Sequence, residues 1–379
     1  MTNSKPSLDL LTELTDENVL SALITEPRLT RAELATMTGI SKPTIGESVR
    51  RLTEVGMIRD TGERTTGRGR VGSYYALAAD IGCALAVSIA PEGIVAETID
   101  VRSEVLARAV AEVPRPASPA AVGSALRAVV ATVRDASGPV IRLAVVSAAD
   151  PVDRATGRLV QLPDAPFLVG DLDARAILGE LVGGAVVVDN DVNWAALAER
   201  SADKSAAMDN FVYIYLGEGL GAAVVSDGEV RRGHAGLSGE IAHLITTGNR
   251  GRATPFTEVF RELGVRHAGS TAIDVDGLIA AVAANGAAGR KALDTIASAT
   301  CGVLAAAVAL TDPGVIVLGG GWGGHPTVLD AVGDAFARHP RHVPLRAATV
   351  TEEAPLMGVR GQAVHDLRAA ITGYRRAPH

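Results

Sequence analysis

The sequence predicts an α/β protein that begins with a separate helix-turn-helix module. From residue 80 to the end of the chain, short apolar strands alternate with helices, which is the pattern of an α/β fold. Residues 1–79 instead show three short helices followed by two strands, and a tight turn joins the last two helices. A chain of 379 residues with 47% hydrophobic residues is long enough for two or three domains.

Composition and charge narrow the class of protein. The only two cysteines, Cys83 and Cys301, exclude a disulfide framework and a cysteine-rich zinc cluster. Residues 1–14 lack the apolar core of a signal peptide, and no apolar run of about 20 residues is free of charges or breakers. The formal charge of -7 means that nucleic-acid binding must come from a local surface. We therefore expect a cytoplasmic protein without a membrane partner.

Caps mark the three N-terminal helices. Asp16 can cap the first helix, and Thr30 and Glu33 have the spacing of a capping box for the second, which ends at Gly39. Ser41 can cap the third helix. The apolar faces comprise Val19, Leu20, Leu23 and Ile24 on the first helix and Ile45, Val49 and Leu52 on the third. Two helices joined by a tight turn form the helix-turn-helix pattern.

A basic, glycine-rich segment follows this pattern and predicts a wing. Residues 62–72 separate two short strands and place Arg68 and Arg70 beside glycines, so that they are narrow enough to enter a minor groove. Alone, the segment could be a solvated basic loop, but the adjoining helices favour DNA binding. The candidates for the major-groove face of the third helix are Lys42, Thr44, Ser48 and Arg51. Arg68 and Arg70 are candidates for the minor groove or phosphates.

A buried strand that ends in polar side chains marks the candidate small-molecule site. Residues 185–188 are apolar, Asp189, Asn190 and Asp191 follow, and an alanine-rich helix comes next. Ligands of open α/β sheets bind at strand ends. Asn190 offers a hydrogen-bond donor and an acceptor, and Asp191 can accept two hydrogen bonds, which suits a sugar diol.

Further polar and glycine-rich segments are informative only in combination. Glu240 and His243 are three residues apart, so a helical turn would place both on one face. Such a pair alone is usually a solvated helix face. The glycines of residues 217–221 and 319–321 are, taken alone, more often structural than phosphate-binding.

Together these motifs resemble those of the ROK family, which contains sugar kinases and sugar-responsive repressors such as the xylose and N-acetylglucosamine repressors. The segment Asp189-Asn190-Asp191-Val192-Asn193 is similar to the family's Glu-Asn-Asp-x-Asn. The segment Gly239-Glu240-Ile241-Ala242-His243 resembles its Gly-Glu-x-Gly-His. The third helix begins Ser41-Lys42-Pro43-Thr44-Ile45-Gly46, close to the Ser-x-x-Thr-Val-Ser of the family's repressors.

The resemblance implies an architecture and a set of sugar contacts. It implies two lobes of the actin-like, ribonuclease-H-like type with a sugar cleft between them. We expect a winged helix-turn-helix in residues 1–79, lobes in 80–190 and 191–358, and a final helix in 359–379 that packs on the first lobe. The implied sugar-binding residues are Asn190, Asp191, Glu240, His243, Glu258 and Asp164.

Two departures from the family's pattern concern cofactors. The family's kinases carry Asp-x-Gly-Gly-Thr-Lys for ATP, and we compare this motif with residues 80–85, where Cys83, Ala84 and Leu85 replace the last three residues. Because a thiol would occupy the phosphate space and two polar contacts are lost, we predict that ATP is not bound. Residues 247–258 lack the family's zinc-binding cysteines, so we also predict no zinc and no other cofactor.

The combined prediction is a regulator of transcription, and not an enzyme. It binds an operator in double-stranded DNA as a homodimer or higher oligomer, because two half-sites need two recognition helices. A sugar or sugar derivative would favour one orientation of the lobes and reset the spacing of the paired winged helices; relief of repression is the family's usual outcome. The alternative is an ATP-dependent, glucokinase-like sugar kinase with an added DNA-binding domain and Asp191 as its base. A third possibility is a regulator that senses a phosphosugar, a protein partner or nothing.

Overall fold

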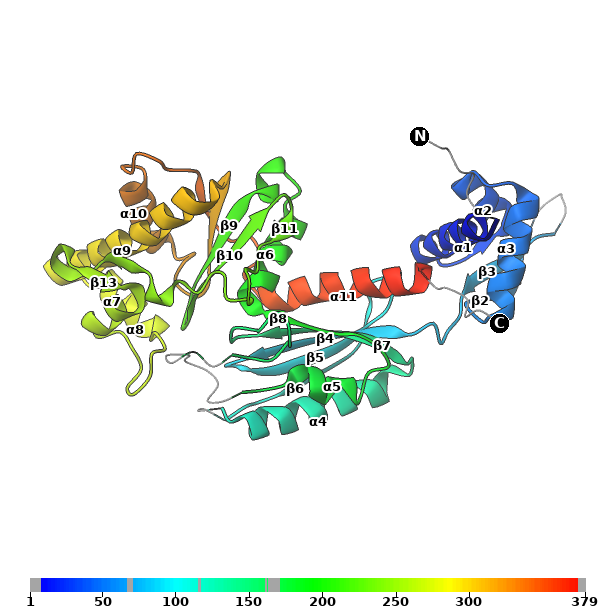
Figure 1. The fold of residues 1–379 in the computed structure, drawn as a ribbon, viewed down its shortest axis with the longest axis horizontal. Helices are drawn as coiled ribbons and strands as arrows, with labels where there is room; N and C mark the ends of the chain where they lie inside the picture. Colours follow the sequence, from blue (N-terminus) through cyan, green and yellow to red (C-terminus); the bar gives the residue numbers. More distant parts are fainter. Residues whose placement is uncertain (1–7, 67–70, 115–116, 161, 163–170, 374–379) are drawn as a thin grey trace.

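The computed structural model describes residues 8–66, 71–114, 117–160, 162 and 171–373. It confirms the α/β fold with an N-terminal winged helix-turn-helix (Figure 1). Three of the predicted site residues, Asp164, Arg68 and Arg70, lie outside the described residues.

The N-terminal domain packs three helices on a small antiparallel sheet. The helices are α1 (Leu8–Thr25), α2 (Arg31–Thr38) and α3 (Lys42–Glu54), and the sheet has the order β1 (Leu29–Thr30), β3 (Ser73–Leu77), β2 (Ile58–Arg64). The predicted capping box is confirmed: Glu33 N–H donates to Thr30 Oγ1 (3.2 Å), and Thr30 N–H donates to the Glu33 carboxylate (2.7 Å). Ser41 caps α3 as predicted. Asp16 does not cap α1, because this helix already begins at Leu8 and Asp16 lies inside it.

The first lobe is a five-stranded sheet covered on both faces. Its order is β6 (Val105–Ala111), β5 (Gly93–Ile99), β4 (Cys83–Ala90), β7 (Ile141–Ala148), β8 (Val186–Asn190). β4, β5 and β6 pair antiparallel, whereas β4, β7 and β8 run parallel. One face packs on α4 (Pro119–Ser137) and α5 (Ala174–Gly179), and the opposite face packs on α11 (Ala354–Thr372), as Figure 1 shows.

The second lobe repeats the strand order of the first. Its sheet runs β11 (Glu229–Val230), β10 (Leu220–Ser226), β9 (Phe211–Leu216), β14 (Val315–Gly319), β15 (Leu345–Ala347), again with one antiparallel and one parallel half. Its helices are α7 (Phe256–Glu262), α8 (Val275–Ala283), α9 (Ala287–Thr311) and α10 (Pro326–Phe336). The smaller elements are η1 (Ala206–Asp209), η2 (Ile241–His243), β12 (Ile245–Thr247), η3 (Asn249–Gly251) and β13 (Ala253–Pro255). Two sheets of the same order are the duplicated arrangement implied by the actin-like resemblance.

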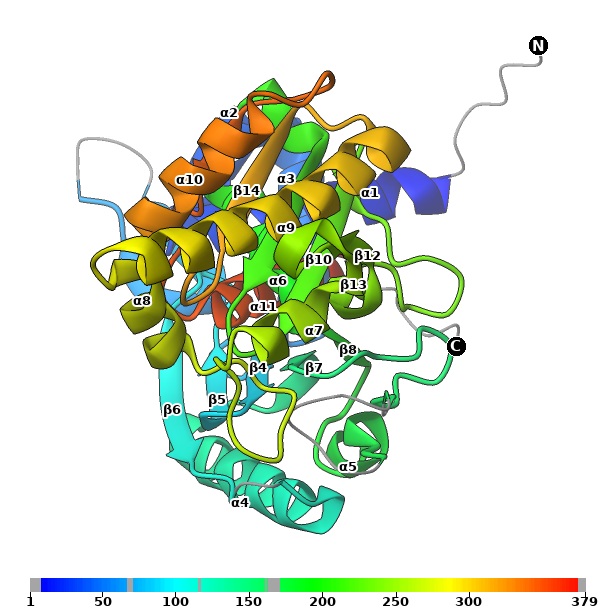
Figure 2. The ribbon, with the colours of Figure 1, turned by 90° about the vertical axis from the view of Figure 1, so that its left-hand side faces the viewer.

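Helix α9 is long and apolar enough to cross a membrane by length and composition alone. In the fold it lies across the second lobe beside α10 and α8 (Figure 2). Ile296, Val303 and Leu304 on this helix are fully or almost fully buried in the core of that lobe. One face of this helix therefore packs on the core of the second lobe.

Two helices connect the parts of the molecule. α6 (Asp191–Ala202) begins at the end of β8 and packs along α11. α11 begins at Ala354, earlier than the predicted residue 359, and extends from the second lobe across the first to α1 (Figure 1). One hydrophobic core contains residues of the winged helix, the first-lobe sheet, α6 and α11. The winged helix-turn-helix domain is therefore packed against the first lobe and is not joined to it by a free linker alone.

Candidate functional site

A cleft of about 1810 Å³ lies where the two sheets face each other. From the first lobe it is lined by the residues that follow β4, β7 and β8. From the second lobe it is lined by the turn between β9 and β10 and by Gly319, Gly320 and Gly321 after β14. The carboxyl ends of the parallel strands in both lobes thus point to one cavity, which is where α/β sheets hold their ligands.

Asn190 and Asp191 lie at the start of α6 and line this cleft. The Asn190 side chain accepts a hydrogen bond from Val192 N–H (3.0 Å) and donates one to the Asp150 carbonyl oxygen (3.3 Å). The Asp191 carboxylate also accepts from Val192 N–H (2.8 Å). Burial raises the pKa of Asp191 to about 7, and the negative charges of Asp150, Glu240 and Glu92 act in the same direction. Burial therefore dominates the protonation of this carboxylate.

Asp189 has a structural role in this turn. Its carboxylate is buried, accepts a hydrogen bond from Asn193 (2.8 Å) and pairs with Arg232 (2.5 Å). Trp194, one residue further along α6, donates to the Val146 carbonyl oxygen of β7 (3.0 Å). These contacts hold the start of α6 against the sheet and fix the direction of Asn190 and Asp191.

Glu240 and His243 both line the cleft, from the second lobe. They are brought together by the short 3₁₀ turn η2 rather than by an α-helix, and in such a turn residues three apart lie above each other. Burial raises the pKa of Glu240 to about 7. The structure therefore places four of the predicted sugar contacts, Asn190, Asp191, Glu240 and His243, around one cavity.

The placement of Glu258 differs from the prediction. Its carboxylate pairs with Arg261 and with Arg266 (3.3 Å), and hydrogen bonding to Arg261 lowers its pKa despite partial burial. Arg261 and Arg266 line the cleft, whereas Glu258 does not. At the position of the family's glutamate, the charge of Glu258 is balanced by two arginines. Glu258 therefore holds two arginines that line the cleft.

The comparison of residues 80–85 with the ATP motif was wrong in position. Cys83 begins β4, and its thiol contacts the carbonyl oxygens of Pro139 (3.6 Å) and Val140 (3.7 Å), which precede β7. β4 runs parallel to β7 and β8, whose carboxyl ends reach the cleft, so Cys83 lies at the opposite end. A strand of this length separates its two ends by roughly 23 Å. The identities of Cys83, Ala84 and Leu85 therefore carry no information about ATP binding in the cleft.

The turn that does reach the cleft joins β4 to β5, and the sequence analysis missed it. Ala90, Pro91, Glu92 and Gly93 of this turn line the cleft. Pro91 has no N–H to donate, and Glu92 brings a carboxylate, so the turn is poorly suited to hold a phosphate. The facing turn of the second lobe contributes another carboxylate, Glu218. The sequence did hold a signal for this turn: the apolar run of β4 ends at Ala90, and ligands bind at strand ends.

Asp150 was also missed as a residue of the site. It follows β7, is 2% exposed and lines the cleft. Its charge opposes ionisation of Asp191. Six carboxylates therefore line the cavity, belonging to Glu92, Asp150, Asp191, Glu218, Glu240 and Glu353. This charge favours hydrogen-bond donors such as hydroxyls and opposes anions.

The segment compared with the zinc motif forms a small hairpin. β12 pairs with β13, and Gly248 N–H donates to the Arg252 carbonyl oxygen (2.7 Å) at its tip. Thr246 anchors it by donating to the Ala299 carbonyl oxygen of α9 (2.5 Å). Within the described residues, no group of three or more histidine, cysteine or acidic side chains could hold a metal ion. The prediction that zinc is not bound stays a prediction.

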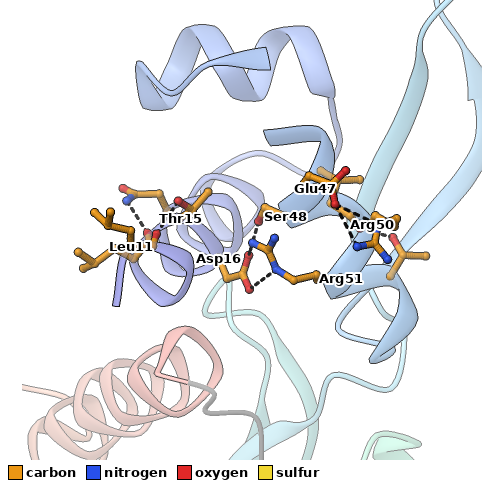
Figure 3. Close-up of polar contacts among 11 residues, drawn as sticks. Leu11, Thr15, Asp16, Glu47, Ser48, Arg50 and Arg51 are labelled. Carbon is orange, nitrogen blue, oxygen red and sulfur yellow. Dashed lines mark hydrogen bonds and ion pairs between the residues drawn. The ribbon is translucent and has the colours of Figure 1, made fainter. Parts of the chain in front are cut away.

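The candidate DNA-binding face of α3 includes fewer residues than predicted, because Ser48 and Arg51 both contact Asp16 of α1 (Figure 3). Lys42 and Thr44 at the start of α3 are exposed. Ser48 is buried and donates a hydrogen bond to Asp16 of α1 (2.5 Å), so the prediction that it contacts DNA was wrong. Arg51 pairs with the same Asp16 (2.7 Å) and is about one-quarter exposed, with 26% of its side chain accessible. Its guanidinium is held inside the domain.

One exposed basic side chain on α3, Arg50, was not among the predicted DNA contacts. Arg50 pairs with Glu47 (3.0 Å) and with Glu54 (2.7 Å), one turn before and after it. Because all three are more than half exposed, these pairs can open to contact DNA bases or phosphates.

A winged helix-turn-helix joined to a two-lobed body with a polar cleft defines a class of DNA-binding regulators. The chain belongs to the ROK family, whose model matches residues 84–363. A second model, winged helix-turn-helix DNA-binding, matches residues 13–59.

Relatives of this chain include both kinases and repressors. It is 27% identical over 205 residues to the bifunctional enzyme NanE/NanK of Brucella suis, covering 52% of this chain and 38% of the relative. It is 29% identical over 164 residues to a glucokinase of Streptomyces coelicolor (43% and 50% covered) and 20% identical over 266 residues to the xylose repressor of Bacillus subtilis (62% of each). The chain thus spans between 38% and 62% of the length of these relatives.

Solved structures show the same fold. A ROK family transcriptional regulator, homologous to the Escherichia coli MLC protein, matches 96% of this chain and 99% of its own with a TM-score of 0.66 and 17% identity. A ROK family glucokinase from Streptomyces griseus, in complex with glucose and AMPPNP, matches 75% of this chain with a TM-score of 0.56 and 22% identity. The regulator extends over the N-terminal domain as well, and at these identities the likeness concerns the fold.

Proposed function

We propose that this protein is a transcriptional repressor whose affinity for operator DNA is controlled by a neutral sugar bound in the interlobe cleft. The observation that carries the proposal is the convergence of Asn190, Asp191, Glu240 and His243 on one cavity in a chain that also carries a winged helix-turn-helix. Hydroxyl groups satisfy such a set of acceptors and donors.

The charge of the cleft supports a neutral ligand over a phosphosugar. Six carboxylates line it, and two of them, Glu92 and Glu218, lie in the turns that face the cavity from either lobe. A phosphate group carries about 1.5 to 2 negative charges at neutral pH and would be repelled there. Three arginines also line the cleft, but Arg108 pairs with Glu97 and Glu353, and Arg261 and Arg266 pair with Glu258.

A sugar kinase is the second candidate, and one observation favours it. The pKa of Asp191 is raised to about 7, which is the value that suits a general base near neutral pH. Against this, the β4–β5 turn offers Pro91 and Glu92 to the cavity. We therefore place the kinase second and attribute the raised pKa to burial of a sugar-binding carboxylate.

We extend the proposal to the assembly and location of the protein. A homodimer would present two copies of α3 to two half-sites of an operator. A cytoplasmic location follows from a role on DNA. The division of the chain at residues 79 and 190 belongs to the same proposal, and the predicted boundary at 358 moves to 353, because α11 begins at Ala354.

Thermal unfolding in the presence of sugars tests the proposal. Purified protein is heated with glucose, xylose and N-acetylglucosamine, and with their phosphates, in the presence and absence of Mg-ATP. A specific ligand at about 100 times its Kd should stabilise the protein by roughly 2.7 kcal/mol. We expect one neutral sugar to act, with no further effect of ATP. Asp191→Asn should abolish the shift, and Glu229→Gln at an exposed position of β11 should keep it. Formation of a sugar phosphate from ATP would instead establish the kinase.

A further inference from the structure

Four charged residues, of which Arg108 and Glu353 line the cleft, form a cluster where α11 meets the sheet of the first lobe. Glu97 of β5 is 1% exposed and accepts hydrogen bonds from Arg360 of α11 (2.5 and 2.7 Å) and from Arg108 of β6. Arg108 also pairs with Glu353, which in turn lies 3.5 Å from Arg360. Burial acts to raise the pKa of Glu97, but its two arginine partners outweigh this and lower it. Glu97 is therefore the ionised centre of the cluster.

Glu353 occupies a special place in this cluster. It lines the cleft together with Arg108. It also stands where the chain leaves the second lobe after β15 and enters α11, which packs on the first lobe. Its φ of 45° is left-handed, a conformation that a glutamate keeps only when surrounding contacts hold it. A cleft-lining, strained residue at the crossing between lobes is suited to respond when the lobes move.

α11 connects this point to the winged helix. Leu356, Val359, Leu367 and Ile371 of α11 are buried in the same core as residues of α1. Two further contacts fasten this junction: Arg102 donates to the Leu23 carbonyl oxygen of α1 (2.7 Å), and Arg368 of α11 donates to the Val101 carbonyl oxygen (2.7 Å). A displacement of α11 would therefore displace α1.

The segment between β15 and α11 also contacts α6, the helix that begins at the proposed sugar site. Glu199 of α6 is fully buried, accepts from Val350 N–H (2.6 Å) and pairs with Arg346 of β15 (3.2 Å). The same helix begins at Asp191 in the cleft. The segment between β15 and α11 is thus held on one side by the helix that carries Asp191 and on the other by Glu353.

We propose that Glu353 is a latch: closure of the lobes on a sugar changes its pairing with Arg108 and Arg360, and α11 passes the movement to the winged helix-turn-helix. This inference rests on the proposed function. In this mechanism the movement is not a hinge motion between independent domains. It is carried by the rigid helix α11, which packs on the first lobe and on the winged helix-turn-helix.

The test separates binding from coupling. A binding duplex is first selected from random-sequence DNA with the wild-type protein. The Kd for this duplex and for the active sugar is then measured for the wild type, Glu353→Gln and the matched control Glu352→Gln, which removes a charge from the neighbouring exposed residue. In the wild type and the control we expect the sugar to change the DNA Kd by about tenfold or more. In Glu353→Gln we expect that change to fall below about twofold, while the variant still binds the sugar.

Each other outcome decides against the latch. An undiminished effect of sugar on DNA binding in Glu353→Gln would overturn it, and loss of sugar binding would make Glu353 a ligand contact instead. If the wild type binds neither sugar nor DNA, the proposed function itself fails. Arg108→Lys is a second variant that keeps a charge beside Glu97 but cannot form the paired contacts of an arginine. Hydrogen exchange of α1 with and without sugar gives a readout independent of DNA.

Discussion

The carboxylate of Asp191 lowers the stability of the folded protein, although the proposed function requires it. Asp191 has a pKa raised to about 7, and its ordinary value is near 4. The folded protein therefore binds a proton at this residue that the unfolded chain has lost between about pH 4 and 7. It follows that the stability contributed by this group falls as pH rises through that window and stays low above it.

Asp191→Asn should therefore stabilise the protein while abolishing its function. At pH 8 we expect the free energy of unfolding to rise by roughly 1–3 kcal/mol, because the costly buried charge is gone. At pH 4 the difference should vanish, since the wild-type residue is then protonated. Urea unfolding at both pH values measures this. Equal stability of variant and wild type at pH 8 would show that the carboxylate is already solvated.

Asp16 illustrates a residue whose role the sequence does not reveal. It lies inside α1 and binds Ser48 and Arg51 of α3, the helix that carries the DNA-binding face (Figure 3). Asp16→Ala would leave the buried Ser48 hydroxyl without this acceptor and should cost about 1–3 kcal/mol of unfolding free energy. Glu54→Gln, which breaks an exposed pair with Arg50, should cost less than about 0.5 kcal/mol. Urea denaturation distinguishes the two, and similar small losses would assign Asp16 a surface role.

Local signals at the residue scale were readable in the sequence, and long-range ones were not. The caps at Thr30 and Ser41 depend on neighbours within three residues, and both were predicted correctly. Ser48 was assigned to the DNA face because its partner, Asp16, is far away in the chain. Asp150 was missed because its relation to Asp191 exists only once β7 and β8 lie side by side.

At the scale of elements, the direction of each strand decides which residues meet the ligand. The sequence indicated that β4 is apolar, but not which of its ends reaches the cleft. Pairing of β4 with β7 settles this, since the two run parallel and β7 leads to Asp150. The ATP comparison was therefore made at the wrong end of the strand. The segment after β8 was placed correctly, because the polar residues and the start of α6 adjoin each other in the chain.

The packing of α11 on α6 depends on one glycine. A Cβ on Gly358 would overlap the carbonyl oxygen of Trp194, so the two helices approach each other at backbone distance there. Gly358→Ala should push them apart and cost about 1–3 kcal/mol of unfolding free energy. In the same helix, a Cβ on Gly361 meets nothing within 4 Å. Gly361→Ala should therefore stabilise by about 0.5–1 kcal/mol. Thermal unfolding of both variants tests this, and equal behaviour would exclude a close contact at Gly358.

The hydrophobic cores of this protein do not follow the boundaries between its DNA-binding domain and its two lobes. The winged helix-turn-helix and one face of the first lobe share a single hydrophobic core, which includes Trp194. The second lobe has a core of its own, which includes Trp322. A DNA-binding domain that shares its core with the body cannot reorient without moving α11. Transmission from the cleft is therefore built into the packing.

This division predicts the order of unfolding. The protein contains two tryptophans, so Trp322→Phe leaves Trp194 to report on the shared core, and Trp194→Phe leaves Trp322 to report on the second lobe. In urea we expect hydrogen-exchange protection of α1 to be lost together with the Trp194 signal, because both belong to one cooperative unit. The Trp322 transition should have its own midpoint. A bound sugar contacts both lobes and should move both midpoints to higher urea. If α1 instead lost its protection well before Trp194 changed, the winged helix would be an independent unit, and α11 could not act as a rigid connection between the cleft and DNA.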